Sequence, residues 1–160
     1  MAAYALLVRD AEPAARRLAH VLCGGGGDGD DAVQEAMVKA WYALPKYRGD
    51  APFRPWLLRI VANQAHNRRR AAGRRAGYEL RVREPAAMLS AEATVFDDGR
   101  RRDLVAAVAA LPERLRDVVA CRYLIELSET ETAEVLGLPA GTVKSRLSRG
   151  LQRLRETVEE

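Results

Sequence analysis

The segment from Ser128 to Leu154 constrains the fold more than any other part of the sequence. Glu131 follows Ser128 at the spacing of a capping box, which predicts a helix over 129–136. Gly137 stands where a helix end favours a left-handed residue, and a second helical pattern follows it. Two short helices joined by a glycine-containing turn form a helix-turn-helix. Its predicted inward-facing side chains are Ala133, Leu136, Val143, Leu147, Leu151 and Leu154.

The second helix of this pattern is basic. Between Pro139 and Arg155 there is no acidic residue, and the face opposite the leucines carries Lys144, Ser145, Ser148 and Arg149. Such a helix fits the major groove of duplex DNA, where its early residues reach base edges. Thr142, near the helix start, suits a phosphate. The alternative is a basic amphipathic helix packed in an ordinary bundle.

The rest of the chain is predicted to be helical, giving an all-α fold, because apolar residues recur at helical spacing and β-branched alternation is absent. A first helix is expected from Pro13 to Leu22, followed by a flexible connector at the glycine run 24–27. Asp30 or Asp31 can cap a second helix, which Pro45 closes. A third is expected to begin near Pro52 and Pro55 and to end in the arginine run 68–70.

Helical periodicity fades between about Ala71 and Gly99, where glycine, proline and arginine are scattered. We therefore predict two small helical domains joined by a flexible linker. Residues 1–72 form the first domain, residues 73–99 the linker, and residues 100–160 the helix-turn-helix domain.

Basic residues outnumber acidic ones by 26 to 22, and they are concentrated in two places. Seven arginines and a single acid, Glu79, lie between Asn67 and Arg83, and the second concentration is the helix after Pro139. Two basic segments in a nearly neutral chain predict two contacts with phosphate backbones. Charge alone would equally fit two solvated helix faces.

Several classes of function are disfavoured. Cys23 and Cys121 are far apart and have no zinc spacing, so both are predicted to be buried apolar residues, with no metal and no cofactor. His20 and His66 are the only histidines, and no nucleophile has an identifiable base, so the protein is not expected to be an enzyme. No leader and no apolar run of about 18 residues is present, which predicts a cytoplasmic protein without membrane insertion.

Two sets of motifs carry a family resemblance. The first comprises Asp31-Ala-Val-Gln-Glu-Ala-Met-Val-Lys-Ala-Trp41, Tyr47-Arg-Gly-Asp50 and Phe53-Arg-Pro-Trp-Leu-Leu-Arg-Ile-Val-Ala-Asn63. It resembles region 2 of extracytoplasmic-function (ECF) sigma factors, in the sigma-70 family. The second comprises Leu111-Pro-Glu, Val118-Val119, Tyr123 and Gly141-Thr-Val-Lys-Ser-Arg146, and is similar to their region 4. Together they cover more than two thirds of the chain in the family's order.

The resemblance implies that region 4 reads the minus-35 duplex and that region 2 melts and reads the minus-10 element. The minus-35 contacts would be Thr142, Lys144, Ser145, Arg146, Ser148 and Arg149. Reading a melted strand needs surfaces for an unstacked base and cations along the backbone. The minus-10 contacts would be Lys39, Tyr47, Arg48, Trp56, Arg59, Asn63 and Asn67, and Arg68 to Arg70 would neutralise phosphates. We expect Trp41 to be core, and Trp56 to pack, to bind a base, or both.

The resemblance also implies partners. Asp31, Gln34, Glu35 and Val38 would dock on the clamp helices of the largest subunit of core RNA polymerase. The region around Val119 and Tyr123 would engage the flap of the second-largest subunit. An anti-sigma factor is a further possible partner. Pro55 stands where many relatives have threonine, which should shift the helix start slightly.

The sequence also fits two other hypotheses about the function. The chain would also suit a stand-alone helix-turn-helix regulator that binds DNA without polymerase. An enzyme acting on nucleic acid is the other alternative, but no catalytic constellation supports it.

Overall fold

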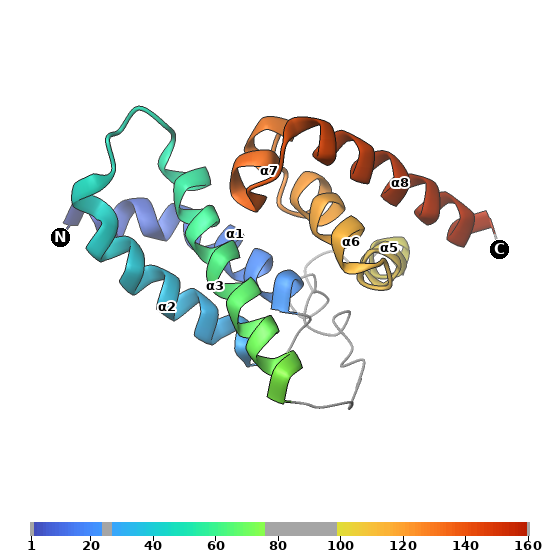
Figure 1. Cartoon of the computed structure of the whole chain (residues 1–160), viewed down its shortest axis with the longest axis horizontal. Coiled ribbons are helices and arrows are strands. Elements are labelled where there is room, and N and C mark those ends of the chain that lie inside the picture. Colours follow the sequence, from blue (N-terminus) through green and yellow to red (C-terminus); the bar gives the residue numbers. More distant parts are fainter. Residues whose placement is uncertain (1, 24–26, 76–98, 160) are drawn as a thin grey trace.

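The computed structural model describes residues 2–23, 27–75 and 99–159, which fold into helices without a strand (Figure 1). They form two helical bundles that lie side by side along the long axis of the molecule. The all-α prediction is therefore confirmed. None of the described helices is long and apolar enough to cross a membrane.

The N-terminal bundle consists of α1 (Ala2–Cys23), α2 (Asp28–Ala43) and α3 (Phe53–Arg75), each packed against the other two. A short 3₁₀ turn, η1 (Leu44–Lys46), follows α2. Their apolar stripes meet in a core whose largest fully buried side chains include Leu18, Leu22, Leu57, Leu58 and Val61. Burying a leucine contributes about 1.5–3 kcal/mol, so this shared core holds the three helices together.

The first helix is longer than predicted, since it begins at Ala2 and contains Pro13. The preceding turns are anchored by Tyr4, whose hydroxyl donates a hydrogen bond to the carbonyl of Met37 at 2.9 Å. The Tyr4 ring also meets Trp41 edge to face, with 5.1 Å between the ring centroids. These tertiary contacts offset the one backbone hydrogen bond that Pro13 cannot donate.

Two other helix ends differ from the predictions. Gly27 is the N-cap of α2 and makes no side-chain cap, so Asp30 and Asp31 lie in the first turn instead of capping it. There their negative charges interact favourably with the positive, N-terminal end of the helix dipole, which stabilises α2. The third helix starts at Phe53, near its predicted start, but continues beyond the arginine run to Arg75. Ala71 and Ala72 favour helix, and one Gly73 costs only about 1 kcal/mol.

The C-terminal bundle consists of α5 (Gly99–Ala109), α6 (Glu113–Val119), the π-helical turn η2 (Ala120–Leu124), α7 (Glu129–Leu136) and α8 (Ala140–Glu159). The predicted capping box is present: Glu131 N–H donates to Ser128 Oγ at 3.1 Å, and Ser128 N–H donates to Glu131 Oε1 at 3.0 Å. Gly137 has φ 65°, the predicted left-handed conformation. On α7 the deepest residues are Thr132 and Val135, with Ala133 and Leu136 half-buried.

The two bundles are docked on each other. Helix α7 packs against α3 and η2 against α1, so Cys121, Ile125, Leu127 and Val135 join the core of the N-terminal bundle. Arg54 donates from Nη2 to the carbonyl of Ile125 at 3.2 Å. The predicted linker, residues 73–99, lies mostly outside the described residues. Residues 73–75 belong to α3 and Gly99 starts α5.

Candidate DNA-binding site

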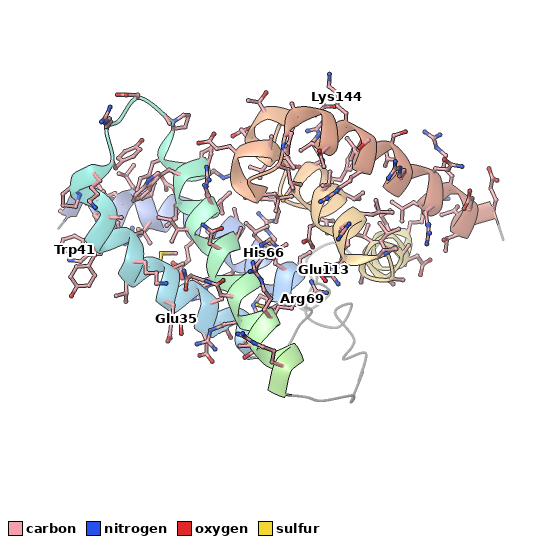
Figure 2. The ribbon with its side chains drawn as sticks, in the orientation of Figure 1. Glu35, Trp41, His66, Arg69, Glu113 and Lys144 are labelled. Carbon is pink, nitrogen blue, oxygen red and sulfur yellow. The ribbon has the colours of Figure 1, made fainter. Side chains whose placement is uncertain are left out.

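The outer face of α8 presents its polar side chains to solvent. Lys144, Ser145, Ser148 and Arg149 are exposed, whereas Thr142 and Arg146 are half-buried. Figure 2 shows Lys144 pointing away from the N-terminal bundle. The opposite face is held by the buried Val143, Leu147 and Leu154, which fixes which side chains α8 can offer to a groove. All six predicted residues of this helix are therefore at least partly accessible to solvent.

A surface hollow of about 640 Å³ runs between α8 and the start of α6. Thr142, Ser145, Arg146 and Arg149 line it from α8, together with Arg153. Arg114 lines it from α6 and was missed in the sequence prediction. Its position in the first turn after Pro112 was visible in the sequence, but the packing of α6 on α8 that brings it to this face was not.

Three predicted minus-10 residues share one face of α3. Arg59, Asn63 and Asn67 are exposed and follow one another at four-residue spacing, which places them in one line along the helix. The docked C-terminal bundle contacts α3 through other residues, including Arg54 and His66. Docking therefore leaves this polar line accessible.

The predicted base-receiving residues belong to an aromatic cluster at the start of α3. The ring centroids of Tyr47 and Trp56 lie 4.9 Å apart. The centroid of the Phe53 ring lies 5.4 Å from that of Trp56 and 5.9 Å from that of Tyr47. The Tyr47 hydroxyl donates to the carbonyl of Ala51, which closes the loop on itself. Trp56 is half-buried, so it packs and also keeps part of its ring accessible. Lys39 and Arg48 are exposed nearby in the sequence.

The predicted polymerase-docking residues lie on the outer face of α2. Asp31, Gln34, Glu35 and Val38 are all exposed, and Figure 2 shows Glu35 on this side of the bundle. Arg68 of α3 reaches this face, where it pairs with carboxylates of α2.

Arg68 pairs with carboxylates instead of standing free for phosphate. Its guanidinium lies 3.6 Å from Asp28 and 3.4 Å from Asp31, and it forms a close ion pair with Glu35. The hydrogen bond with Glu35 raises the pKa of Arg68. Arg69 donates to the carbonyl of Leu22 at 3.0 Å. Arg68 and Arg69 therefore already have partners within the protein.

The expectation that Trp41 is core is wrong. Trp41 is 39% exposed and its neighbour Tyr42 is 77% exposed. With Leu44 and Pro45 they line a hollow of about 380 Å³ at the end of α2. The residues expected at the flap differ too: Val119 is 1% exposed and belongs to the core, whereas Tyr123 is 52% exposed. Of these two residues, Tyr123 alone offers its side chain to a partner.

Neither cysteine forms a disulfide. Cys121 is buried, as predicted, whereas Cys23 is half-buried and its thiol lies 3.8 Å from the carbonyl of Ala65. Within residues 2–23, 27–75 and 99–159, no group of three or more His, Cys, Asp or Glu residues is arranged to hold a metal.

The sequence of each bundle matches the model of a known protein family. A sigma-70 region 2 model matches residues 7–75, and a sigma-70 region 4 model matches residues 101–154. The ECF RNA polymerase sigma-E factor of Escherichia coli strain K12 is 35% identical over 143 residues, which cover 83% of this chain and 75% of that protein. The Haemophilus influenzae sigma-E factor is 30% identical over 139 residues, with 81% and 74% covered.

Solved structures share the whole arrangement. CnrH, determined in complex with the cytosolic domain of CnrY, superposes with a TM-score of 0.68 at 27% identity, covering 98% of this chain and 88% of that one. RpoE of Bartonella quintana, determined with the anti-sigma factor NepR, gives a TM-score of 0.76 at 22% identity, covering 99% and 98%.

The fold and the exposed basic helix define a two-bundle, helix-turn-helix DNA-binding protein. The relatives narrow this class: the chain belongs to the ECF sigma factors of RNA polymerase, in the sigma-70 family.

Proposed function

We propose that this sigma factor directs core RNA polymerase to promoters by reading the minus-35 duplex with α8 and opening the minus-10 element with α3. Residues 1–72 act as region 2, residues 73–99 as the linker and residues 100–160 as region 4. The observation that carries the proposal is the pair of exposed polar faces, one on each bundle, both left accessible by the docking of the bundles.

Duplex reading is assigned to the outer face of α8. Lys144 and Arg149 donate hydrogen bonds to guanine acceptors, while Ser145 and Ser148 can pair with several bases. Thr142 and Arg146, at the edge of the same face, contact the backbone. A helix rigidly backed by Val143 and Leu147 holds these donors at fixed spacing, which direct readout requires.

Strand opening is assigned to the aromatic cluster and the polar line on α3. The accessible part of Trp56 and the Tyr47 ring provide stacking surface for an unstacked base. Asn63 and Asn67 offer amide groups to base edges, while Lys39, Arg48 and Arg59 neutralise the backbone of the separated strand.

The outer face of α2 is assigned to core polymerase. Asp31, Gln34, Glu35 and Val38 form a surface that contacts the clamp helices of the largest subunit, and exposed Tyr123 contacts the flap of the second-largest subunit. An anti-sigma factor controls access to these surfaces, an assignment supported by the structure of RpoE from Bartonella quintana, which was determined with the anti-sigma factor NepR.

A gel shift on promoter duplex with and without core polymerase tests the proposal. We expect weak binding by the protein alone and tight, specific binding by the holoenzyme, because the polar faces must be positioned by polymerase. Tight, specific binding by the isolated protein would contradict the proposal and favour a stand-alone regulator.

A further inference from the structure

A second hollow, of about 580 Å³, lies where the two bundles meet. The end of α3, the start of α6 and the side of α8 form its walls, and Figure 2 shows His66, Arg69 and Glu113 close together there. The full lining is His66, Arg69, Arg70, Gly73, Glu113, Arg114, Asp117 and Arg146.

The two carboxylates of this hollow are already paired across it. Asp117 Oδ2 lies 3.3 Å from His66 Nε2, and Glu113 Oε1 lies 3.3 Å from Arg69 Nη1. Both pairs join one bundle to the other. Neither carboxylate is therefore left to neutralise the other arginines of the lining.

Three arginines of the lining remain without an acidic partner. Arg70 comes from α3, Arg114 from α6 and Arg146 from α8, and none of them pairs with a carboxylate of the described part of the chain. Four arginines face two carboxylates in the lining, which leaves an excess of positive charge.

A buried arginine precedes Asp117 of the lining in the chain. Arg116 is only 6% exposed, its Nε lies 3.6 Å from Asp117 Oδ1, and its Nη2 has no hydrogen-bond partner among the described residues. Burial lowers the pKa of Arg116, and the neighbouring charge of Arg69 lowers it further. The hollow is thus a place where positive charges crowd in a partly desolvated setting, and where an anion would relieve their repulsion.

We propose that this interdomain hollow binds a compound or segment that carries two or more phosphate groups, held by Arg70, Arg114 and Arg146. Guanidinium groups bind phosphate through paired N–H donors, and three of them from three helices can take adjacent phosphates. The volume falls within the usual range of small-ligand sites.

The site joins residues of both bundles, so it exists only while they are docked. Arg70 belongs to the N-terminal bundle, whereas Arg114 and Arg146 belong to the C-terminal bundle. A ligand that needs both stabilises the docked form by its binding free energy. Phosphate binding here therefore opposes separation of the bundles.

Two sources of phosphate fit this chemistry. Arg114 and Arg146 also line the hollow along α8, so the basic surface is continuous from the DNA-reading face to α3. The phosphates can accordingly be those of a free polyphosphate compound or of a DNA backbone that continues past α8.

Calorimetric titration of the full chain with tripolyphosphate at low salt tests the site. We expect saturable binding of one molecule per chain, weakened about tenfold or more by Arg70→Glu and by Arg114→Glu. Arg9→Glu is the matched control, because Arg9 is exposed on α1 and changes the net charge equally. It should alter affinity less than about twofold. The proposal is overturned if tripolyphosphate does not bind, or if Arg9→Glu weakens binding as much as Arg70→Glu and Arg114→Glu do.

Repeating the titration with a duplex of arbitrary sequence separates the two sources. If Arg70→Glu weakens duplex binding as strongly as tripolyphosphate binding, the site takes backbone phosphates. If it weakens only tripolyphosphate binding, the ligand is a free phosphate compound. Both tests use the protein without polymerase, so their failure is distinguishable from a failure of the proposed promoter recognition.

Discussion

In the proposed function, the exposed side chains of α8 determine which DNA this protein recognises, because the residues behind them are fixed by packing. Lys144 and Arg149 stand on the solvent face, while Val143 and Leu147 hold the opposite face in the core. Truncating the exposed residues should therefore change DNA recognition without changing the fold.

We expect Lys144→Ala with Arg149→Ala to weaken holoenzyme binding at the minus-35 element, since each base contact contributes about 1–3 kcal/mol. Binding to core polymerase should remain, because both residues lie away from α2. Gel shifts and core pull-down measure the two properties. Arg155→Ala, an exposed change further along α8, is the control. Loss of core binding together with promoter binding would contradict the division of roles.

At the other bundle, Trp56→Ala with Asn63→Ala should still permit a closed promoter complex while abolishing strand opening, because the stacking surface and an amide donor are removed. Permanganate reactivity of thymines in the minus-10 element reports the opening. Unchanged reactivity would rule out this cluster as the base-receiving site. Circular dichroism should accompany the test, since Trp56 also packs against Phe53.

Both thiols are held protonated by their surroundings. Burial raises the pKa of Cys23 to about 11, and burial also raises the pKa of Cys121. At pH 8, alkylation of Cys23 by iodoacetamide should be slower than that of an unfolded thiol by on the order of a hundredfold, because only the thiolate reacts. Modification at the unfolded rate would contradict the burial.

The raised pKa of Cys23 also makes the free energy of unfolding depend on pH. The folded state holds the Cys23 proton more tightly than the unfolded state. The stabilisation from the protonated thiol is therefore fully present below pH 9.0 and is lost as the pH rises toward about 11.

The sequence predicts the exposure of a side chain where that exposure depends on its own helix. The outer face of α8 follows from helical periodicity alone, and the six residues predicted on this helix are exposed or half-buried. Arg68 and Trp41 could not be placed this way, because their surroundings come from other helices: carboxylates of α2 surround Arg68, and Tyr4 of α1 meets Trp41.

At the scale of elements, the position of α8 depends on close contact with α6. A Cβ atom on Gly150 would lie 2.6 Å from Cγ2 of Val119, a core residue that is almost fully buried. Val119 is β-branched and stiff, so it cannot easily turn away. The absence of a side chain at Gly150 therefore allows α8 to pack directly against α6.

We expect Gly150→Ala to lower the free energy of unfolding by about 1 kcal/mol, since overpacking costs about 1–3 kcal/mol and helix propensity returns about 1. Gly141→Ala in the same helix meets nothing within 4 Å and should be neutral or stabilising by up to about 1 kcal/mol. Urea denaturation of the three proteins gives the comparison. Equal stabilities for both variants would contradict the packing of α8 on α6.

The sequence predicted which segments form helices, but it did not predict where some of these helices begin and end. The Ser128 capping box and the Gly137 turn are local, and both have the predicted geometry. The start of α1 depends instead on the hydrogen bond from Tyr4 to Met37, thirty-three residues away, which no local pattern contains.

At the scale of the whole molecule, the docked arrangement is too short to span a promoter. Packed helices lie about 8–10 Å apart, α7 is about 12 Å long and α3 about 35 Å. Since α7 packs on α3 and leads directly into α8, the start of α8 lies within about 60 Å of every part of α3. Elements centred about 25 base pairs apart are separated by about 85 Å of B-DNA. The bundles must therefore separate before both elements are read.

Locking the bundles together should abolish transcription. Arg69→Cys with Glu113→Cys replaces an ion pair between the bundles and allows a short, reducible bismaleimide to join them, while the native thiols react slowly. We expect no run-off transcript from the cross-linked protein and recovery after reduction. The same double variant without cross-linker is the control. Full transcription by the cross-linked protein would contradict the need for opening.

The docking itself was not predicted from the sequence. Its apolar contacts use Ile125, Leu127 and Val135, which read equally well as core of their own bundle, and its ion pairs join residues more than 40 positions apart. Sequence patterns identify the helices and their faces, but which faces meet depends on shape complementarity between distant segments.

The proposed function makes this chain the subunit that gives core RNA polymerase its promoter specificity. Run-off transcription from a pool of randomised promoters, with purified core enzyme and the full chain, measures this property. We expect transcripts only when the protein is added, starting downstream of a shared pair of motifs at minus-35 and minus-10 spacing. A core enzyme that neither binds the protein nor gains any start site from it would rule out a sigma factor function.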